Sequence, residues 1–104
     1  MEKIKVVQSL IQEYADFFNN ANDNPHIKYE CITDTMHQHF QIVKIGWRGQ
    51  HRVYGIIFHI DVIEDKIWIQ QNNSEFDIFE EFIESGITKH EIVLGYIMPE
   101  PELA

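Results

Sequence analysis

The chain has 104 residues and a mass of 12.4 kDa, and 44% of its residues are hydrophobic. This length supports one hydrophobic core and is too short for two, so we expect a single domain over residues 1–104. The formal net charge is -9, from 8 basic and 17 acidic residues, and it argues against direct binding of the protein alone to the DNA backbone. An acidic surface instead favours basic partners.

Cysteine content and hydropathy point to the compartment. Cys31 is the single cysteine, so no intramolecular disulfide can form and a reducing compartment is the simpler expectation. The first residues lack the apolar core of a secretory signal, and no apolar run approaches the roughly 20 residues that a membrane span needs. We therefore expect a cytoplasmic protein that makes no contact with a membrane.

Residues 3–18 are predicted to form one amphipathic helix, because their apolar residues recur at helical spacing. These residues are Ile4, Val7, Leu10, Ile11, Tyr14, Phe17 and Phe18. The Asn-rich stretch 19–25 ends the helix, since its side chains bond readily to nearby backbone. Two strands are expected next, over residues 27–33 and 40–47.

Two predicted hairpins set a register for the following strands. A turn at Glu64-Asp65 places Val62 opposite Ile67, Asp61 opposite Trp68, Ile60 opposite Ile69 and His59 opposite Gln70. A turn at Gly49-Gln50 places Val43 and Ile45 opposite Ile56 and Tyr54. One face of the sheet is then apolar, formed by Tyr54, Ile56, Phe58, Ile60, Val62, Ile67 and Ile69 with Val43 and Ile45.

The opposite face is predicted to be mixed, with Val53, Gly55, Ile57, His59 and Asp61 beside Trp68, Gln70, Ile42 and Lys44. An indole next to branched aliphatic side chains is a common ingredient of interfaces. Two alternatives stay open: this face is exposed to solvent, or a second subunit or another protein covers it.

The C-terminal third is predicted to contain one helix and a short helical turn. Ser74 is the expected cap of a helix whose apolar stripe ends near Gly86. Thr88 and Glu91 have capping-box spacing, which suggests one helical turn, and the segment with Pro99 and Pro101 is expected to be extended. The predicted fold is therefore α+β, with an N-terminal helix, an antiparallel sheet of about four strands and a C-terminal helix packed on one sheet face.

Two histidine patterns raise the question of a metal site. His59 and Asp61 lie two apart on one strand face, and His37 and His39 repeat that spacing. A small metal-dependent enzyme using His59 and Asp61 is one alternative, but it needs two further ligands and no recognised ligand motif is present. We expect His59 to be a structural, hydrogen-bonded residue, and we predict no metal, no cofactor and no catalytic residue.

The tip of the first hairpin is basic. Arg48, His51 and Arg52 lie close together in the sequence and offer contacts to a phosphate or a carboxylate. Three residues do not outweigh the acidic charge of the whole chain, so we expect only a supporting role for this tip.

Six short segments in series resemble the XisI family, the fdxN element excision controlling factors of cyanobacteria. They are 11–15 (IQEYA), 46–47 (GW), 52–55 (RVYG), 59–61 (HID), 66–71 (KIWIQQ) and 92–95 (IVLG). The resemblance implies an α+β fold and a part in DNA rearrangement, as an accessory factor that acts with the companion protein XisH and a separate recombinase. It supplies no catalytic residues.

We therefore expect a non-enzymatic accessory factor that controls site-specific excision through contacts with an XisH-type companion. It would form homo-oligomers and touch DNA only indirectly. The predicted partner-binding residues are His59, Asp61, Trp68, Gln70, Arg48 and Arg52. An alternative is that the chain is an acidic inhibitor or antitoxin of an XisH-type, nuclease-like protein.

Overall fold

The structure is a computed structural model that describes residues 3–98, so the predicted extended segment at Pro99 and Pro101 lies outside it. Two helices, one 3-10 helix and five strands occur in these residues. In chain order they are α1 (Lys3–Ala21), β1 (Ile27–Asp34), β2 (His39–Arg48), β3 (His51–Ile63), β4 (Lys66–Asn72), α2 (Ile78–Glu84), η1 (Lys89–Glu91) and β5 (Ile92–Leu94).

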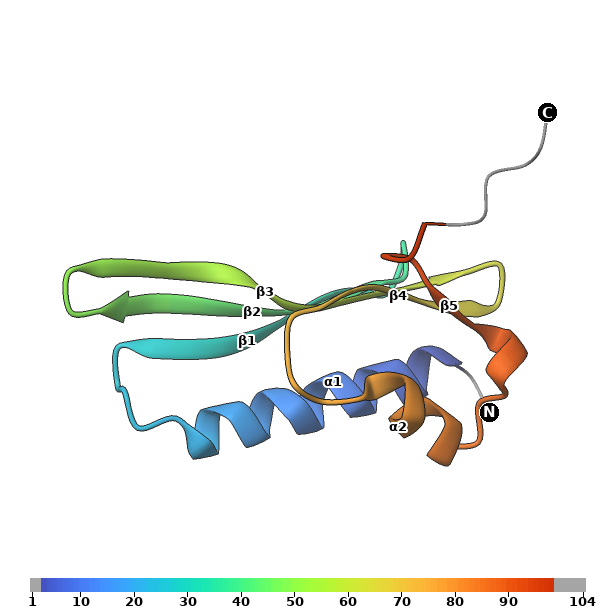
Figure 1. The fold of residues 1–104 in the computed structure, drawn as a ribbon, viewed down its shortest axis with the longest axis horizontal. Helices are drawn as coiled ribbons and strands as arrows, with labels where there is room; N and C mark the ends of the chain where they lie inside the picture. The colour runs from blue at the N-terminus through green and yellow to red at the C-terminus, as the bar shows by residue number, and fades with distance from the viewer. Residues whose placement is uncertain (1–2, 99–104) are drawn as a thin grey trace.

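The elements form two layers, with α1 and α2 on the same side of one sheet (Figure 1). The strand order is β1-β2-β3-β4-β5, so each strand lies beside its neighbour in the sequence. The first four strands are antiparallel as predicted, but β5 adds a fifth strand parallel to β4. The sheet is therefore mixed. Within residues 3–98 neither helix is long and apolar enough to cross a membrane.

Helix α1 covers the predicted span and continues three residues further, to Ala21. The Asn-rich stretch then acts as expected, because its side chains bond to nearby backbone. Asn19 donates to the carbonyl of Tyr29 at 2.8 Å and accepts from its amide at 2.9 Å. Asn22 donates to the carbonyl of Ile27 at 2.9 Å. These bonds fix where β1 enters the sheet.

The core lies between the helices and the sheet. Its largest fully buried side chains are Phe40, Phe58, Phe82, Ile11, Ile42, Ile60, Ile67, Ile69, Ile78, Val7 and Val43. All of them except Val43 belong to one continuous cluster. Burial of this apolar surface is the main force that holds α1 and α2 on the sheet.

Two β-bulges modify the predicted register. Between β2 and β3, Ile42 pairs with Phe58 and Val43 pairs with Ile56, so Ile57 is an extra residue. Between β3 and β4, Ile60 pairs with Ile69 but His59 pairs with Gln71, so the extra residue is Gln70. The predicted pairing of His59 with Gln70 was therefore wrong by one position.

The first bulge also corrects the predicted apolar face. Ile57 packs against the core, whereas Tyr54 is 67% exposed. Lys44 lies 5.6 Å above the ring of Tyr29, which stacks on Phe18 of α1, so Lys44 is on the helix side. By strand alternation the neighbours of Lys44 point to the other face.

The predicted apolar face is thus right for Phe58, Ile60, Val62, Ile67 and Ile69, which are all buried in the core. It is wrong for four residues, Tyr54, Ile56, Val43 and Ile45. The opposite-face prediction was wrong for Ile42, Ile57 and Lys44, and for Gly55, which pairs with Lys44, and Val53 on the same side of β3. Side chains of a strand point alternately to its two faces, so one extra residue in β3 reverses the alternation. The residues on the far side of the bulge therefore point to the face opposite to the predicted one.

The cap of α2 also differs from the prediction. Asp77, not Ser74, is the N-cap, because its carboxylate accepts from the amide of Glu80 at 3.1 Å. The hydroxyl of Ser74 instead bonds to Asn72 at 2.7 Å and accepts from the amide of Phe76 at 3.1 Å. Ser74 therefore shapes the loop that leads into the helix.

Candidate functional site

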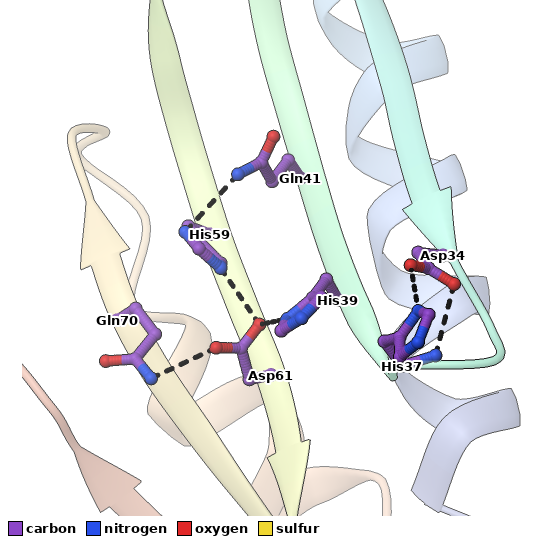
Figure 2. A network of polar contacts seen from close by, with 7 residues as sticks. All are labelled: Asp34, His37, His39, Gln41, His59, Asp61 and Gln70. Atoms are coloured by element: carbon purple, nitrogen blue, oxygen red, sulfur yellow. Dashed lines mark hydrogen bonds and ion pairs between the residues drawn. The ribbon is translucent and has the colours of Figure 1, made fainter.

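A cluster of polar side chains occupies the sheet face that α1 and α2 leave uncovered. We name it the Asp61 cluster, and its members are His39 and Gln41 of β2, His59 and Asp61 of β3, and Gln70 of β4 (Figure 2). His39 Nδ1 lies 2.8 Å and His59 Nε2 lies 2.9 Å from the same oxygen, Oδ1 of Asp61. Gln70 Nε2 donates to Oδ2 of Asp61 at 3.1 Å.

The bulges assemble this cluster. In a regular ladder, the pairing of Val43 with Ile56 would place His39 opposite Ile60. Because Ile57 is an extra residue, His39 instead pairs with Asp61 across β2 and β3. The second bulge supplies Gln70 as its extra residue, beside the same carboxylate. The sheet irregularities therefore determine which side chains meet at Asp61.

Asp61 is a nearly buried carboxylate, with 6% of its surface exposed. Burial raises its pKa, but hydrogen bonds from His39, His59 and Gln70 outweigh that effect, and the net pKa lies below the usual value. The hydrogen bond to Asp61 raises the pKa of His39, whose side chain is about half exposed. The carboxylate is thus held ionised in a fixed orientation.

The hydrogen bonds assign the histidine tautomers. An ionised carboxylate only accepts, so His39 carries a proton on Nδ1 and His59 carries one on Nε2. With its proton on Nε2, the His59 ring can present Nδ1 as an acceptor, and Gln41 Nε2 lies 3.4 Å from it. Every buried side-chain nitrogen and oxygen among the described residues has a partner.

Three of the six predicted partner-binding residues, His59, Asp61 and Gln70, meet directly in this cluster. Trp68 pairs with Asp61 across β3 and β4, so the half-buried indole lies on the same face. Val93 of β5 pairs with Trp68 in turn and continues the surface. These residues form one contiguous area.

The other two predicted residues, Arg48 and Arg52, lie at the far end of the β2–β3 hairpin. Arg52 lies seven positions before His59 in β3, which corresponds to roughly 23 Å along a strand. The Arg52 guanidinium lies 5.5 Å above the ring of Trp47 and 5.9 Å above that of Tyr54. The basic tip is therefore a separate site.

The structure places His37 and His39, which lie two positions apart in the sequence, in different surroundings. His37 Nδ1 lies 2.8 Å from Oδ2 of Asp34, in the turn between β1 and β2, away from the cluster (Figure 2). His39 and Gln41 join the cluster, although the sequence prediction had linked neither of them to Asp61. The available signal was the run Ile56-Ile57-Phe58, in which three consecutive apolar residues break the alternation and allow a bulge without fixing it.

The Asp61 cluster lies on the surface of the sheet. Four cavities of the described residues lie elsewhere, and one of 380 Å³ between α1 and α2 is lined by Lys5, Val6, Ser9, Leu10, Glu13, Glu81 and Ser85. None of these four is lined by a member of the cluster. Cys31 is also remote from it: Sγ lies 3.7 Å from the carbonyl of Ile11 in α1, and burial raises the pKa of the thiol.

The fold and the site together define a small α+β protein in which helices cover one face of the sheet. The uncovered face carries a hydrogen-bonded cluster of two histidines and an aspartate. The XisI protein family model matches residues 1–102, and the chain belongs to the XisI family. This confirms the resemblance seen in the sequence.

Solved structures agree with this assignment. A XisI-like protein from Anabaena variabilis is 31% identical, with a TM-score of 0.85 over 92% of this chain and 85% of that one. The fdxN element excision controlling factor XisI from Anabaena variabilis is 28% identical, with a TM-score of 0.80 over 94% of this chain and 92% of that one. None of the curated proteins compared with the chain matches it.

Proposed function

We propose that this protein is a non-enzymatic accessory factor that controls site-specific excision of a DNA element through contacts with an XisH-type companion. Membership of the XisI family supports the process. So does the likeness to a structure described as an fdxN element excision controlling factor. The XisH-type companion is what the resemblance to the XisI family implies, and the surface around Asp61 and Trp68 supports a contact with a protein partner.

The observation that carries the proposal is the uncovered sheet face around Asp61 and Trp68. Its polar groups are already bonded to one another, so a partner can cover them without leaving a buried group unpaired. The half-buried Trp68 offers a large apolar contact next to this ordered polar area. Such a surface suits a protein partner better than a small substrate, which needs a concave site.

Any role of DNA is proposed to be indirect. The net charge of -9 opposes binding to a polyanion, and the basic residues of the hairpin tip are few. Arg52 also stacks over aromatic rings and donates to the carbonyl of Gly46 at 3.4 Å. We assign Arg48 and Arg52 a peripheral part in the contact with the companion.

A pull-down of the XisH-type companion tests the proposal. Trp68→Ala is expected to weaken binding by about 2 kcal/mol, or roughly 30-fold, because a buried indole at an interface centre is a common hot spot. Trp47→Ala is the matched control, since this indole is 48% exposed at the far end of the hairpin. It should change binding by less than about threefold, the limit for a peripheral residue.

Thermal melts of both variants show whether they remain folded. Phe58→Ala is the reference for a large loss of stability. Truncation of this fully buried ring should lower the free energy of unfolding by about 3–5 kcal/mol. We expect Trp68→Ala to cost less than that. Companion binding that is identical for wild type and Trp68→Ala would place the contact elsewhere. Sedimentation of the same samples tests our further proposal that the protein forms homo-oligomers.

A second candidate function is inhibition of an XisH-type, nuclease-like companion. The net charge of -9 favours it, because an acidic protein can cover a basic nucleic-acid site. An assay of the companion's nuclease activity with and without this protein separates the two functions. Stoichiometric loss of activity favours the inhibitor, and unchanged activity in a stable complex favours the excision factor.

A further inference from the structure

Three potential metal ligands converge on the uncovered sheet face. One ligand atom each from His39, His59 and Asp61 lies within 4.8 Å of the others. They come from the adjacent strands β2 and β3, so the sheet ladder holds their backbones in place. The sequence offered His59 and Asp61 as one pair and His37 and His39 as another, and nothing in it joined the two pairs. The third donor depends on the bulge at Ile57.

We propose that His39, His59 and Asp61 form a binding site for a divalent first-row transition-metal ion of the zinc type. This inference is independent of the proposed function and of any companion. Two imidazole nitrogens and one carboxylate oxygen are a common set of three protein ligands, which leaves the remaining position to water or to a group on a bound molecule.

Two of the three separations between ligand atoms are close to those around such an ion. Ligands at about 2.0–2.1 Å from a tetrahedral ion are separated from one another by about 3.3 Å. The two nitrogen–oxygen pairs in the cluster measure 2.8 and 2.9 Å. These two pairs need to open by about half an ångström, and the two imidazole nitrogens, which lie within 4.8 Å of each other, need to approach to the same separation. The ion then takes the position of the two N–H protons, and each imidazole carries its proton on the other ring nitrogen.

The ligand types select the class of metal. Calcium prefers six to eight oxygen ligands, and magnesium prefers six in a strict octahedron. A site with two imidazoles and one carboxylate suits zinc, cobalt or nickel better. The half-exposed His39 and the absence of any covering helix over this face leave the open position accessible to solvent within the described part of the chain.

Two glutamines hold the ligands in place. Gln70 donates to Oδ2 of Asp61 and leaves Oδ1 free for the ion. Gln41 lies 3.4 Å from Nδ1 of His59. When Nε2 of His59 binds the ion, Nδ1 carries the proton, and the Gln41 amide turns over so that its oxygen accepts it. Such outer hydrogen bonds are typical of metal-binding histidines and carboxylates.

Zinc titration of the full chain, free of any histidine tag, tests the proposal by calorimetry. We expect one ion per chain, no heat with magnesium, and visible absorption bands of a low-coordinate site with cobalt. Gln70→Ala should weaken zinc binding by about 10- to 100-fold, and His39→Ala should weaken it further. His37→Ala and His51→Ala are controls that each remove a histidine outside the cluster, in the β1–β2 turn and at the far end of the β2–β3 hairpin, and should bind zinc like the wild type.

Circular dichroism confirms that each variant is folded, and Asp61→Asn provides a second test that keeps the shape of the side chain. The proposal is overturned if zinc does not bind at up to about 1 mM, far above the concentration at which a built site fills. Binding that His39→Ala and Asp61→Asn both leave intact would equally overturn it, because the ion would then lie elsewhere. Equal binding of magnesium would contradict the assigned ligand set.

Discussion

Gly46 lies at a position where the backbone leaves no room for a side chain. Its φ is 153°, and a Cβ there would lie 1.9 Å from the carbonyl oxygen of His26 and 2.7 Å from Cα of Ile27. That carbonyl accepts the amide of Trp47 at 3.0 Å, so it cannot move aside freely. Gly46 is therefore needed where β1 begins to pair with β2.

Replacing Gly46 tests this close approach. Gly46→Ala should lower the free energy of unfolding by at least about 2 kcal/mol, because backbone atoms must shift. Gly55→Ala is the control, since no atom lies within 4 Å of its Cβ and its φ is not in the positive region. The control should be within about 0.5 kcal/mol of the wild type. Urea denaturation measures both, and equal midpoints would contradict the steric account.

At the scale of secondary-structure elements, the sequence could predict periodicity and turns. Helix α1 and the hairpin at Glu64-Asp65 follow from local patterns, and both turn residues adopt positive φ as a tight two-residue hairpin requires. Strand alternation also predicts that His59 and Asp61, the two cluster residues on β3, lie on the same face. These features depend on residues that are close together in the chain.

The bulges could not be placed in the same way, because they depend on packing between strands. Ile56, Ile57 and Phe58 are all apolar, so either phase of the strand offers a hydrophobic face. Packing against α1 determines which of the two phases the strand adopts. The phase in turn determines whether His39 lies close enough to bond to Asp61. Strand β5 has three residues, which is too short to show a period, so the fifth strand was missed.

Helix α2 has only seven residues, so its N-cap should matter. Asp77→Ala removes the acceptor for the amide of Glu80 and should lower the free energy of unfolding by about 1 kcal/mol. Asp77→Asn keeps a side-chain oxygen and should cost only a few tenths of a kcal/mol. Thermal melts at neutral pH compare the two. Equal losses for both variants would show that charge at the helix start, and not the hydrogen bond, is what matters.

Across the whole molecule, Lys3 links the start of α1 to two later segments of the chain. This residue of α1 forms ion pairs with Glu91 of η1 at 2.5 Å and with Asp65 of the β3–β4 turn at 3.3 Å. A second link joins α1 to α2, where the hydroxyl of Tyr14 donates to Glu81 at 3.0 Å. Burial and this bond raise the pKa of Tyr14 to about 12. Polar contacts thus join the N-terminal helix to both later segments.

The Lys3–Glu91 pair predicts how stability depends on acid. Hydrogen bonds from Lys3 and Thr88 lower the pKa of Glu91 from 4.5 to about 2. Because the folded state favours the ionised carboxylate, its contribution to stability is present above pH 4.5 and is lost as the pH falls through about 2. Glu91→Gln should therefore flatten the pH dependence of the free energy of unfolding between about pH 4.5 and 2.

The measurement is a series of urea melts across this pH range, with Glu84→Gln as the control on the exposed surface of α2. Glu84→Gln should keep the wild-type slope. Asp34 and Asp61 also have lowered pKa values from bonds to histidines, so Glu91→Gln should retain part of the slope. Lys3→Gln removes the principal partner of Glu91 and should flatten the curve in the same range. Wild-type slopes in both variants would show that this ion pair does not couple α1 to η1 in the way proposed.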